Sequence, residues 1–462
     1  MDFSLGLASA PRPLKTTTSR CPRCLAAIPA EVVEADGRIV MRKRCSAHGA
    51  FESVLASDPA HYHLARGADR GTESGCCGSG CGCTPAPAAD AGSEKANLFE
   101  SLSTCVALIE IVDTCNLTCP TCYASSPFGV GDDLAGLPFA DFVGRVSGVL
   151  ERKGTIDILQ LSGGEPTLHP EFEAILRWCT DESRIGYTLV NTNGVRLATD
   201  DAFRARLGTM RRAGANFELY LQFDGPQEAG QRALRGADLR AVRERAADEC
   251  GAAGIPTTLA MTVTPENLPH VGEALQWGLA RPHVRGITFQ PVFTSGRVPE
   301  REAVPIGVAD VVAGLVAQAP GLVAAADFTP LPCGDPNCHT IGYLLRTDDG
   351  PVGLSRLVDV AAFQDFLADR LDYRIEDLLR CGCETEPLGE LIKSLELGPD
   401  RPYRIFIKPF MDAWTFDQDR IDRCCTHVIR PDGQLDSFCR YYLHGGAAAY
   451  SDRGTVPLTV SR

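Results

Sequence analysis

Short apolar runs alternate with longer amphipathic stretches through the middle of the chain. The runs are residues 105–111, 156–162, 186–192, 217–223, 256–263 and 285–292. Most of them start about 30 residues apart, which is the length of one strand and one helix in a βα unit. The pattern predicts an α/β fold with a parallel sheet. Six such units form a partial (β/α)6 TIM-like barrel rather than a closed barrel of eight.

Different patterns flank this repeat, and the predicted segments are 1–70, 71–104, 105–295 and 296–462. The first holds an alternating stretch around the turn dipeptide Asp36-Gly37, which predicts a β-hairpin in a small module. The second joins a glycine- and cysteine-rich run to a linker of proline, alanine and polar residues. The third is the barrel. The fourth is expected to be mostly helical up to about residue 400 and to end in a cysteine-bearing module.

Length and composition narrow the class of protein. The 462 residues are 44% apolar, which suffices for a large core. The formal net charge of −14 repels phosphate backbones, so nucleic acid is not expected as a partner. No apolar run is long enough for an integral membrane segment, and the opening residues lack the apolar stretch of a signal peptide. We therefore expect a cytoplasmic protein.

The chain contains 20 cysteines, and most of them are clustered. In a reducing compartment, clustered thiols are metal ligands far more often than disulfides. Only Cys179 and Cys250 stand alone, and we expect them to be small buried apolar side chains.

Three cysteines follow the first apolar run with the spacing CxxxCxxC, and they are Cys115, Cys119 and Cys122. Three thiolates can hold three irons of a cubane cluster and leave the fourth iron open for a ligand. A structural zinc knot fits less well, because such sites use four ligands, normally in two pairs. The triplet also falls at the carboxyl end of a strand, which is where active sites of βα barrels assemble.

The triplet resembles the cluster motif of radical S-adenosylmethionine (SAM) enzymes, and later motifs extend the resemblance. SGGEP at 162–166 is similar to the glycine-rich SAM motif of that family, and VNTNG at 190–194 and QFDG at 222–225 end successive strands with polar residues. Consecutive glycines also allow a backbone to approach a ligand closely. The family usually has an aromatic residue before the third cysteine; here Thr121 has that place, and Tyr123 is the candidate for the adenine contact.

The resemblance implies which residues bind and what they do. Cys115, Cys119 and Cys122 are implied to hold a catalytic 4Fe–4S cluster, at which SAM is cleaved by one electron to a 5′-deoxyadenosyl radical that abstracts hydrogen from an unactivated C–H bond. An electron donor such as ferredoxin or flavodoxin is then required. The implied SAM contacts are Tyr123, Gly163, Gly164, Glu165, Pro166, Asn191, Asn193, Gln222 and Asp224.

The first module contains a second candidate metal site. CPRC and CSAH supply Cys21, Cys24, Cys45 and His48 on two knuckles joined by the predicted hairpin. Three sulfurs and one imidazole suit tetrahedral zinc or mononuclear iron, as in a rubredoxin or a zinc ribbon, and the sequence does not separate the two metals.

The remaining cysteines are candidates for one or two auxiliary 4Fe–4S clusters. The first set is Cys77 (or Cys76), Cys81, Cys83 and Cys105. The alternative for that segment is a flexible, redox-sensitive tail. The second set is Cys333, Cys338, one or both of Cys424 and Cys425, and Cys439. Cys381 and Cys383 could replace some of these or form a further redox pair.

The layout of these cysteines along nearly the full chain resembles one radical SAM subgroup. It contains archaeal tetraether lipid synthase and the 7,8-dihydro-6-hydroxymethylpterin methyltransferases. The resemblance implies either methyl or methylene transfer to a pterin-like small molecule or C–C coupling of lipid alkyl chains. The sequence lacks an obvious basic amphipathic helix for membranes, which favours the small molecule.

Two functions of other classes are alternatives to a radical SAM enzyme. A non-catalytic electron carrier or metal-binding scaffold would need no SAM motif, yet the triplet and SGGEP are both intact. A zinc-stabilised hydrolase would be expected to carry a nucleophile elbow, and no G-x-S-x-G is present.

Overall fold

The computed structural model describes residues 11–64, 97–102, 104–299, 306–330, 334–357 and 401–447. Several predictions fall outside these ranges: the ligands Cys76, Cys77, Cys81, Cys83 and Cys333, the pair Cys381 and Cys383, and the helices expected between 358 and 400. Within the described ranges, no helix combines the length and the apolar character that crossing a membrane requires.

The N-terminal module is a four-stranded antiparallel sheet with the order β1-β2-β3-β4. Its strands are β1 (Arg12–Arg20), β2 (Ala27–Ala35), β3 (Arg38–Cys45) and β4 (Gly49–Ala56). The hairpin predicted around Asp36-Gly37 joins β2 and β3, and both turn residues have positive φ, of 50° and 69°. Helix α1 (Pro59–Leu64) follows.

Six parallel strands form the centre of the large sheet, in the order of the chain. They are β5 (Val106–Val112), β6 (Ile156–Gly163), β7 (Ile185–Thr192), β8 (Phe217–Gln222), β9 (Thr257–Val263) and β10 (Val284–Pro291). Each lies within one or two residues of an apolar run in the sequence. The α/β fold predicted from the sequence is confirmed.

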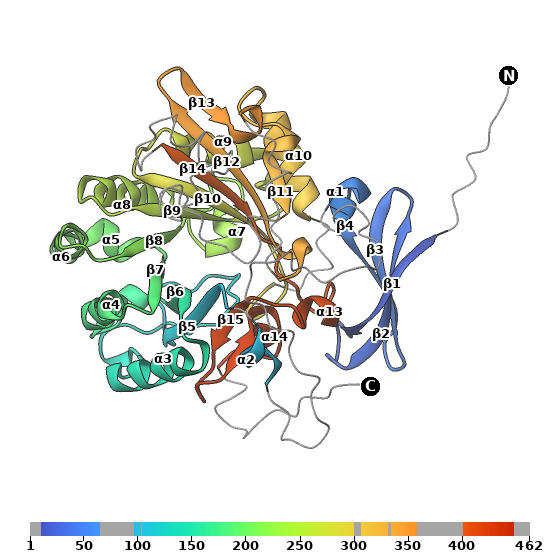
Figure 1. Cartoon of the computed structure of the whole chain (residues 1–462), viewed down its shortest axis with the longest axis horizontal. Coiled ribbons are helices and arrows are strands. Elements are labelled where there is room, and N and C mark those ends of the chain that lie inside the picture. The colour runs from blue at the N-terminus through green and yellow to red at the C-terminus, as the bar shows by residue number, and fades with distance from the viewer. Residues whose placement is uncertain are drawn as a thin grey trace, which may run out of the picture.

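Amphipathic helices cover the outer face of this sheet (Figure 1). The helices between the strands are α3 (Phe139–Lys153), α4 (Phe172–Asp181), α5 (Val195–Thr199), α6 (Asp201–Arg212), α7 (Gln231–Arg235), α8 (Arg240–Ala252) and α9 (Val271–Leu279). Helix α3 shows the pattern, because it buries Phe142, Val146, Val149 and Leu150 on one stripe. The Asp200 carboxylate caps α6 by accepting a hydrogen bond from the Phe203 amide.

The C-terminal part of the chain widens the sheet at both edges. β14 (Pro402–Ile407) pairs in parallel with β10, and β15 (Thr426–Ile429) pairs in parallel with β5. The six predicted strands thus become eight parallel ones. Antiparallel strands lie beyond them: β16 (Leu435–Ser437) beside β15, and β12 (Thr340–Thr347), β11 (Phe328–Pro330) and β13 (Gly350–Gly353) beyond β14.

Four further α-helices lie in the described part of the chain. They are α2 (Leu98–Ser101), α10 (Val308–Gln318), α13 (Gln418–Ile421) and α14 (Phe438–Leu443). Helix α10 lies within the stretch expected to be helical. That expectation is wrong for residues 328–330 and 340–353, where β11, β12 and β13 extend the sheet beyond β14. The division of the chain into four segments stays a prediction.

The N-terminal sheet docks on the segment just before α13. The buried Lys43 ammonium donates hydrogen bonds to the carbonyls of Ala413 (2.6 Å) and Trp414 (2.7 Å). The Lys15 ammonium forms an ion pair of 2.6 Å with Asp417. Figure 1 shows β1 to β4, in blue, beside α13 on the side of the molecule opposite the outer helices.

Candidate active site

A cavity of about 280 Å³ lies inside the curve of the large sheet. All eight parallel strands contribute to its lining, and so do Cys115, Cys119 and Cys122. The three cysteines belong to the loop after β5, residues 113–122, which we call the cluster loop. Cys119 is buried, and the other two are partly exposed to the cavity. The triplet predicted from the sequence therefore faces the space where a ligand can bind.

The SGGEP segment packs directly against the cluster loop. The Gly164 amide donates to the Val112 carbonyl (2.7 Å), and the Glu165 amide donates to the Thr114 carbonyl (3.1 Å). A Cβ atom on Gly164 would lie 1.9 Å from the Thr114 carbonyl oxygen, and one on Gly163, whose φ is +112°, would lie 2.1 Å from that of Val112. This close approach of the two backbones requires both glycines.

A second segment holds the other end of the cluster loop. Cys122 and Arg297 exchange two backbone hydrogen bonds, of 2.8 and 2.9 Å. The Arg297 guanidinium also donates to the Cys119 carbonyl (2.8 Å). Gly296 packs against the end of the cluster loop, since a Cβ there would be 2.2 Å from the Tyr123 carbonyl oxygen. The sequence did not indicate this clamp, because Gly296 and Arg297 belong to no motif and lie far along the chain.

The Glu165 carboxylate is occupied by its own surroundings. It accepts hydrogen bonds from the Thr192 hydroxyl (2.8 Å), the Asn193 amide (2.7 Å) and Thr167. Burial raises the pKa of Glu165, and these hydrogen bonds oppose the rise. The side chain therefore ties the end of β6 to the end of β7, and it remains part of the cavity lining.

A chain of polar side chains crosses the inner face of the sheet. The Tyr123 and Ser162 hydroxyls lie 3.0 Å apart, and the Asn191 amide donates to Ser162 (2.8 Å). The Gln160 amide in turn donates to Asn191 (2.6 Å). All four residues line the cavity. Tyr123 and Asn191, both predicted from the sequence, are thus brought together by β6.

Asn193 lies next to the cluster loop. Its side-chain amide donates to the Asn116 carbonyl oxygen (2.7 Å) and lies 3.7 Å from the Cys115 sulfur. Among the predicted SAM contacts, Asn193, Gln222, Gly163 and Gly164 line the cavity, whereas Pro166 and Asp224 do not. The binding roles predicted for these residues stay predictions.

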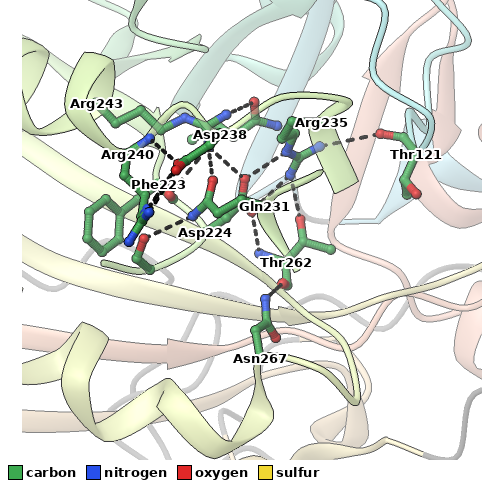
Figure 2. A network of polar contacts seen from close by, with 12 residues as sticks. Thr121, Phe223, Asp224, Gln231, Arg235, Asp238, Arg240, Arg243, Thr262 and Asn267 are labelled. Carbon is green, nitrogen blue, oxygen red and sulfur yellow. Dashed lines mark hydrogen bonds and ion pairs between the residues drawn. The ribbon is translucent and has the colours of Figure 1, made fainter. Parts of the chain in front are cut away.

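Asp224 sits at the centre of a buried arginine network (Figure 2). Its carboxylate binds the Arg235 guanidinium at two points (2.7 and 2.9 Å) and approaches Arg243 at 3.2 Å. It also accepts a hydrogen bond from the Thr262 amide (3.1 Å). Asp224 therefore supports Arg235, which lines the cavity and donates to the Thr121 carbonyl of the cluster loop (3.3 Å).

The electrostatics around the cysteines suit a bound cation. Burial, followed by the charge of Glu165, raises the pKa of Cys115 to about 12. A metal ion replaces the proton of such a thiol, and binding of the metal keeps the sulfur deprotonated. Burial also raises the pKa of Cys119, while the positive charge of Arg235 opposes the rise. The triplet thus fits a metal cluster chemically.

The four predicted ligands in the N-terminal sheet converge. The ligand atoms of Cys21, Cys24, Cys45 and His48 all lie within 4.8 Å of one another. His48 Nδ1 is 3.6 Å from the Cys21 sulfur and 3.5 Å from the Cys45 sulfur, and the sulfurs of Cys24 and Cys45 are 4.0 Å apart. Three sulfurs and one imidazole at these distances suit a tetrahedral ion.

The C-terminal cysteines lie behind one wall of the cavity. The Arg420 guanidinium donates to the Cys338 sulfur (3.3 Å), and the Met411 amide donates to the Cys439 sulfur (3.3 Å). Burial raises the pKa of Cys338, Cys424 and Cys439, and the three thiols affect one another electrostatically. These three form a group, whereas their predicted partner Cys333 lies outside the described residues.

Two other predicted ligands lie elsewhere in the core. Cys105 is fully buried just before β5, and its amide donates to the carbonyl of the buried Cys425 (3.0 Å). The predicted partners of Cys105 lie outside the described residues. Cys179 and Cys250 are buried in the main hydrophobic core, as expected.

Comparison with known proteins matches two parts of the chain to families. Residues 109–278 match the radical SAM superfamily. Residues 13–57 match the N-terminal zinc ribbon domain of HMPTM proteins. The chain is also 25% identical to the 7,8-dihydro-6-hydroxymethylpterin dimethyltransferase of Methanocaldococcus jannaschii, over 92% of this chain and 93% of that protein.

Solved structures show weaker likenesses. Streptococcus suis SuiB has 14% identity and a TM-score of 0.37, over 48% of this chain and 49% of its own. The FeFe-hydrogenase maturase HydG of Carboxydothermus hydrogenoformans has 16% identity and a TM-score of 0.36, over 48% and 54%. The chain thus spans about half the length of these two proteins.

The fold, the cysteine triplet and the sequence matches define the class of protein: the chain is a radical SAM enzyme. Within that superfamily it resembles the pterin dimethyltransferase of M. jannaschii along nearly its whole length. The resemblance to radical SAM enzymes and the prediction of an enzyme are confirmed. Membership of the superfamily implies SAM and a 4Fe–4S cluster, and the zinc ribbon implies a bound metal ion.

Proposed function

We propose that this enzyme transfers a methyl or methylene group to a pterin-like small molecule by radical functionalisation of an unactivated C–H bond. The cluster and SAM, once bound, supply a 5′-deoxyadenosyl radical for this chemistry. The observation that carries the proposal is the set of polar side chains that the strands place in the cavity lining beside the cysteine triplet. The M. jannaschii relative, named for a dimethyltransferase of a hydroxymethylpterin, supports the same substrate class.

Polar side chains distributed through the mostly apolar lining favour a flat heterocycle over alkyl chains. Strands β6 to β10, β14 and β15 each place at least one polar side chain in the lining, among them Gln160, Tyr220, Thr258, Gln290 and Arg404. These groups already pair within the protein, for example Gln160 with Asn191 and Gln290 with Tyr220. The donors and acceptors that they have left over would find no partner on an alkyl chain, at a cost of about 1–3 kcal/mol for each buried group. A pterin ring carries nitrogen and oxygen atoms that can pair with them. Lipid coupling is therefore the alternative function.

Residues around the cluster loop have distinct proposed roles. Cys115, Cys119 and Cys122 would hold the cluster, and Gly163 and Gly164 let the SAM-binding strand end lie against the loop. Tyr123, Asn191 and Gln222 would contact SAM from the strand ends. Exclusion of water falls to the aromatic wall, which consists of Phe293, Phe410, Phe438 and Tyr442 beside Tyr123.

An auxiliary iron–sulfur cluster on Cys338, Cys424 and Cys439 is also proposed, with Cys333 as the fourth ligand. Its support is the approach of three partly buried thiols near the positive charges of Arg420 and Lys408. A second auxiliary cluster would use Cys105 with the glycine- and cysteine-rich segment. We also propose that a ferredoxin or flavodoxin reduces the enzyme and that the N-terminal zinc ribbon binds a zinc or iron ion. The protein is proposed to be cytoplasmic.

The first test is SAM cleavage by the reconstituted enzyme. Under anaerobic conditions with dithionite, wild type should release 5′-deoxyadenosine, and the C115A/C119A/C122A variant should release none. The variant's ribbon metal content should be unchanged, which controls for folding. Zinc in the wild type without any SAM cleavage would support the alternative of a metal-binding scaffold.

The second test addresses the substrate. Wild type with SAM and 7,8-dihydro-6-hydroxymethylpterin should give products heavier by one or two CH2 units in mass spectrometry, because each added methyl group replaces a hydrogen. Lipid substrates with unactivated alkyl chains serve as the comparison. Coupled lipid products together with unchanged pterin would overturn the proposed substrate class while leaving the radical chemistry in place.

A further inference from the structure

The cavity lining contains three basic side chains, and two of them have carboxylate partners. Arg235 is bound to Asp224, and the Arg404 guanidinium lies 3.6 Å from the buried Glu218 carboxylate. Within the described ranges, Lys408 has no carboxylate within ion-pair distance. Of the three basic side chains in the described lining, Lys408 is therefore the one that forms no ion pair with a described residue.

Lys408 is held in a fixed position at the end of β14. Its backbone amide donates to the Phe289 carbonyl (2.9 Å), which continues the pairing of β14 with β10. Its ammonium donates to the Thr426 hydroxyl (2.9 Å) at the start of β15 and lies 5.2 Å from the centre of the Phe410 ring. An ammonium has three N–H donors, so donors remain for a ligand.

The surroundings of this ammonium suit recognition of one polar atom on a flat molecule. Phe406 and Phe410 line the cavity on either side of Lys408 in the chain, and Thr426 lies opposite. A half-buried cation in an aromatic wall is incompletely solvated, so an oxygen acceptor from a ligand gains more there than it would in water.

We propose that Lys408 determines substrate specificity by donating a hydrogen bond to a carbonyl or anionic oxygen of the substrate ring. The inference rests on the proposed function, because it names a contact for the same ring substrate. The competing role is that of a counter-charge to the C-terminal cysteines, since Lys408 also acts electrostatically on Cys338 and Cys424.

The test compares Lys408→Met, which keeps most of the length of the side chain but removes the charge, with Lys408→Arg, which keeps a cation. The probe is fluorescent 6-hydroxymethylpterin, titrated into the anaerobic, cluster-loaded full chain. We expect Kd to rise about ten- to a hundredfold in K408M, as for loss of a hydrogen bond to a charged group. K408R should recover most of the affinity. The Kd for SAM and the iron content should match wild type in both variants.

Each contrary result has one meaning. Pterin affinity in K408M equal to that of wild type would overturn the role of Lys408 and leave the proposed function intact. Loss of iron in K408M with unchanged pterin affinity would assign Lys408 to the cysteines instead. If wild type cleaves SAM but does not bind the probe, the pterin proposal fails, and the inference about Lys408 fails with it.

Discussion

At the scale of single residues, the polar groups nearest the cluster loop are mostly bonded to one another. Asp224 is fully buried with a φ of +58°, a backbone conformation that non-glycine residues rarely adopt. Burial alone would raise its pKa, but Arg235 and Arg243 more than offset that effect, so the pKa lies below its usual value. Asp224 thus stays charged and keeps both guanidinium groups in place.

Replacement of this carboxylate tests the network. Asp224→Asn leaves two buried guanidinium groups without their counter-charge, and we expect a loss of about 3–5 kcal/mol in the free energy of unfolding. Chemical denaturation measures the change. The matched control is Asp238→Asn, because Asp238 pairs with Arg240 at 2.7 Å near the surface, where such a pair contributes about 0–1 kcal/mol. Equal effects in the two variants would contradict the network.

The glycines of the SGGEP motif offer a second test at this scale. Gly164→Ala places a methyl group against the Thr114 carbonyl, so the cluster loop must shift. We expect SAM cleavage to fall at least about tenfold, as small misplacements near reacting groups cost that much or more. The control is Gly144→Ala on the exposed face of α3, where the added Cβ meets no atom within 4 Å. That variant should keep its activity and gain up to about 1 kcal/mol of stability.

These residues also show how far sequence reasoning reaches. The cysteine triplet and SGGEP could be identified from the sequence because the residues of each motif are close together in the chain. Arg235, Gly296 and Arg297 were missed, because each meets the cluster loop only through the fold. Asp224 was expected at the ligand because it ends a strand, yet its side chain turns toward arginines supplied by α7 and α8.

At the scale of elements, the strands and helices between residues 105 and 292 follow the periodicity of the sequence. Long stripes such as that of α3 and the strongly apolar runs leave little ambiguity. β14 and β15 were not predicted as barrel strands. β15 has only four residues, all of them buried, and such a short run carries no readable period. Their partners β10 and β5 are also remote in the sequence.

The docking of the ribbon on the segment before α13 predicts a dependence on pH. Burial alone would raise the pKa of Asp417, but contacts with Lys15 and Thr17 more than offset that effect, so its pKa is lowered. Its ion pair therefore stabilises the fold above the ordinary aspartate pKa of about 3.9, and this contribution is lost as the pH falls through the lower folded value.

We expect Asp417→Asn to lower the free energy of unfolding by about 1–3 kcal/mol at neutral pH. The difference from wild type should shrink as the pH falls toward 3, measured by denaturant unfolding of both proteins at each pH. Loss of metal in acid affects the two proteins alike and cancels in the difference. A difference that stays constant down to pH 3 would rule out the charged pair as its source.

At the scale of the whole molecule, a line of contacts joins the ribbon to the cluster loop. Lys43 binds the carbonyl of Trp414, whose amide donates to the Asp412 carboxylate (2.9 Å). The same carboxylate accepts hydrogen bonds from the Thr294 amide (2.8 Å) and hydroxyl (2.7 Å). Thr294 stands three residues before Arg297, which clamps the loop.

Removal of the metal ion from the zinc ribbon should therefore loosen the segment that contacts the cluster loop. In a Cys21→Ala, Cys45→Ala double variant, we expect faster hydrogen exchange in residues 293–297 and 412–417 as well as in the ribbon, because ordering of the ribbon depends on its ion. Helix α4, which lies on the far side of the sheet, is the internal reference. Faster exchange confined to residues 11–64 would show that the ribbon is independent of the barrel.

The positions of β14 and β15 at the edges of the sheet affect folding during translation. The Thr104 hydroxyl lies 3.0 Å from a ring nitrogen of His427, although the two residues are 323 positions apart. While the ribosome is still making the last part of the chain, β5 and β10 both expose unpaired backbone, the kind of edge that invites association with other chains. The nascent barrel has to remain soluble until residues 402–429 emerge. Expression yield should therefore be especially sensitive to truncation at the C-terminal end.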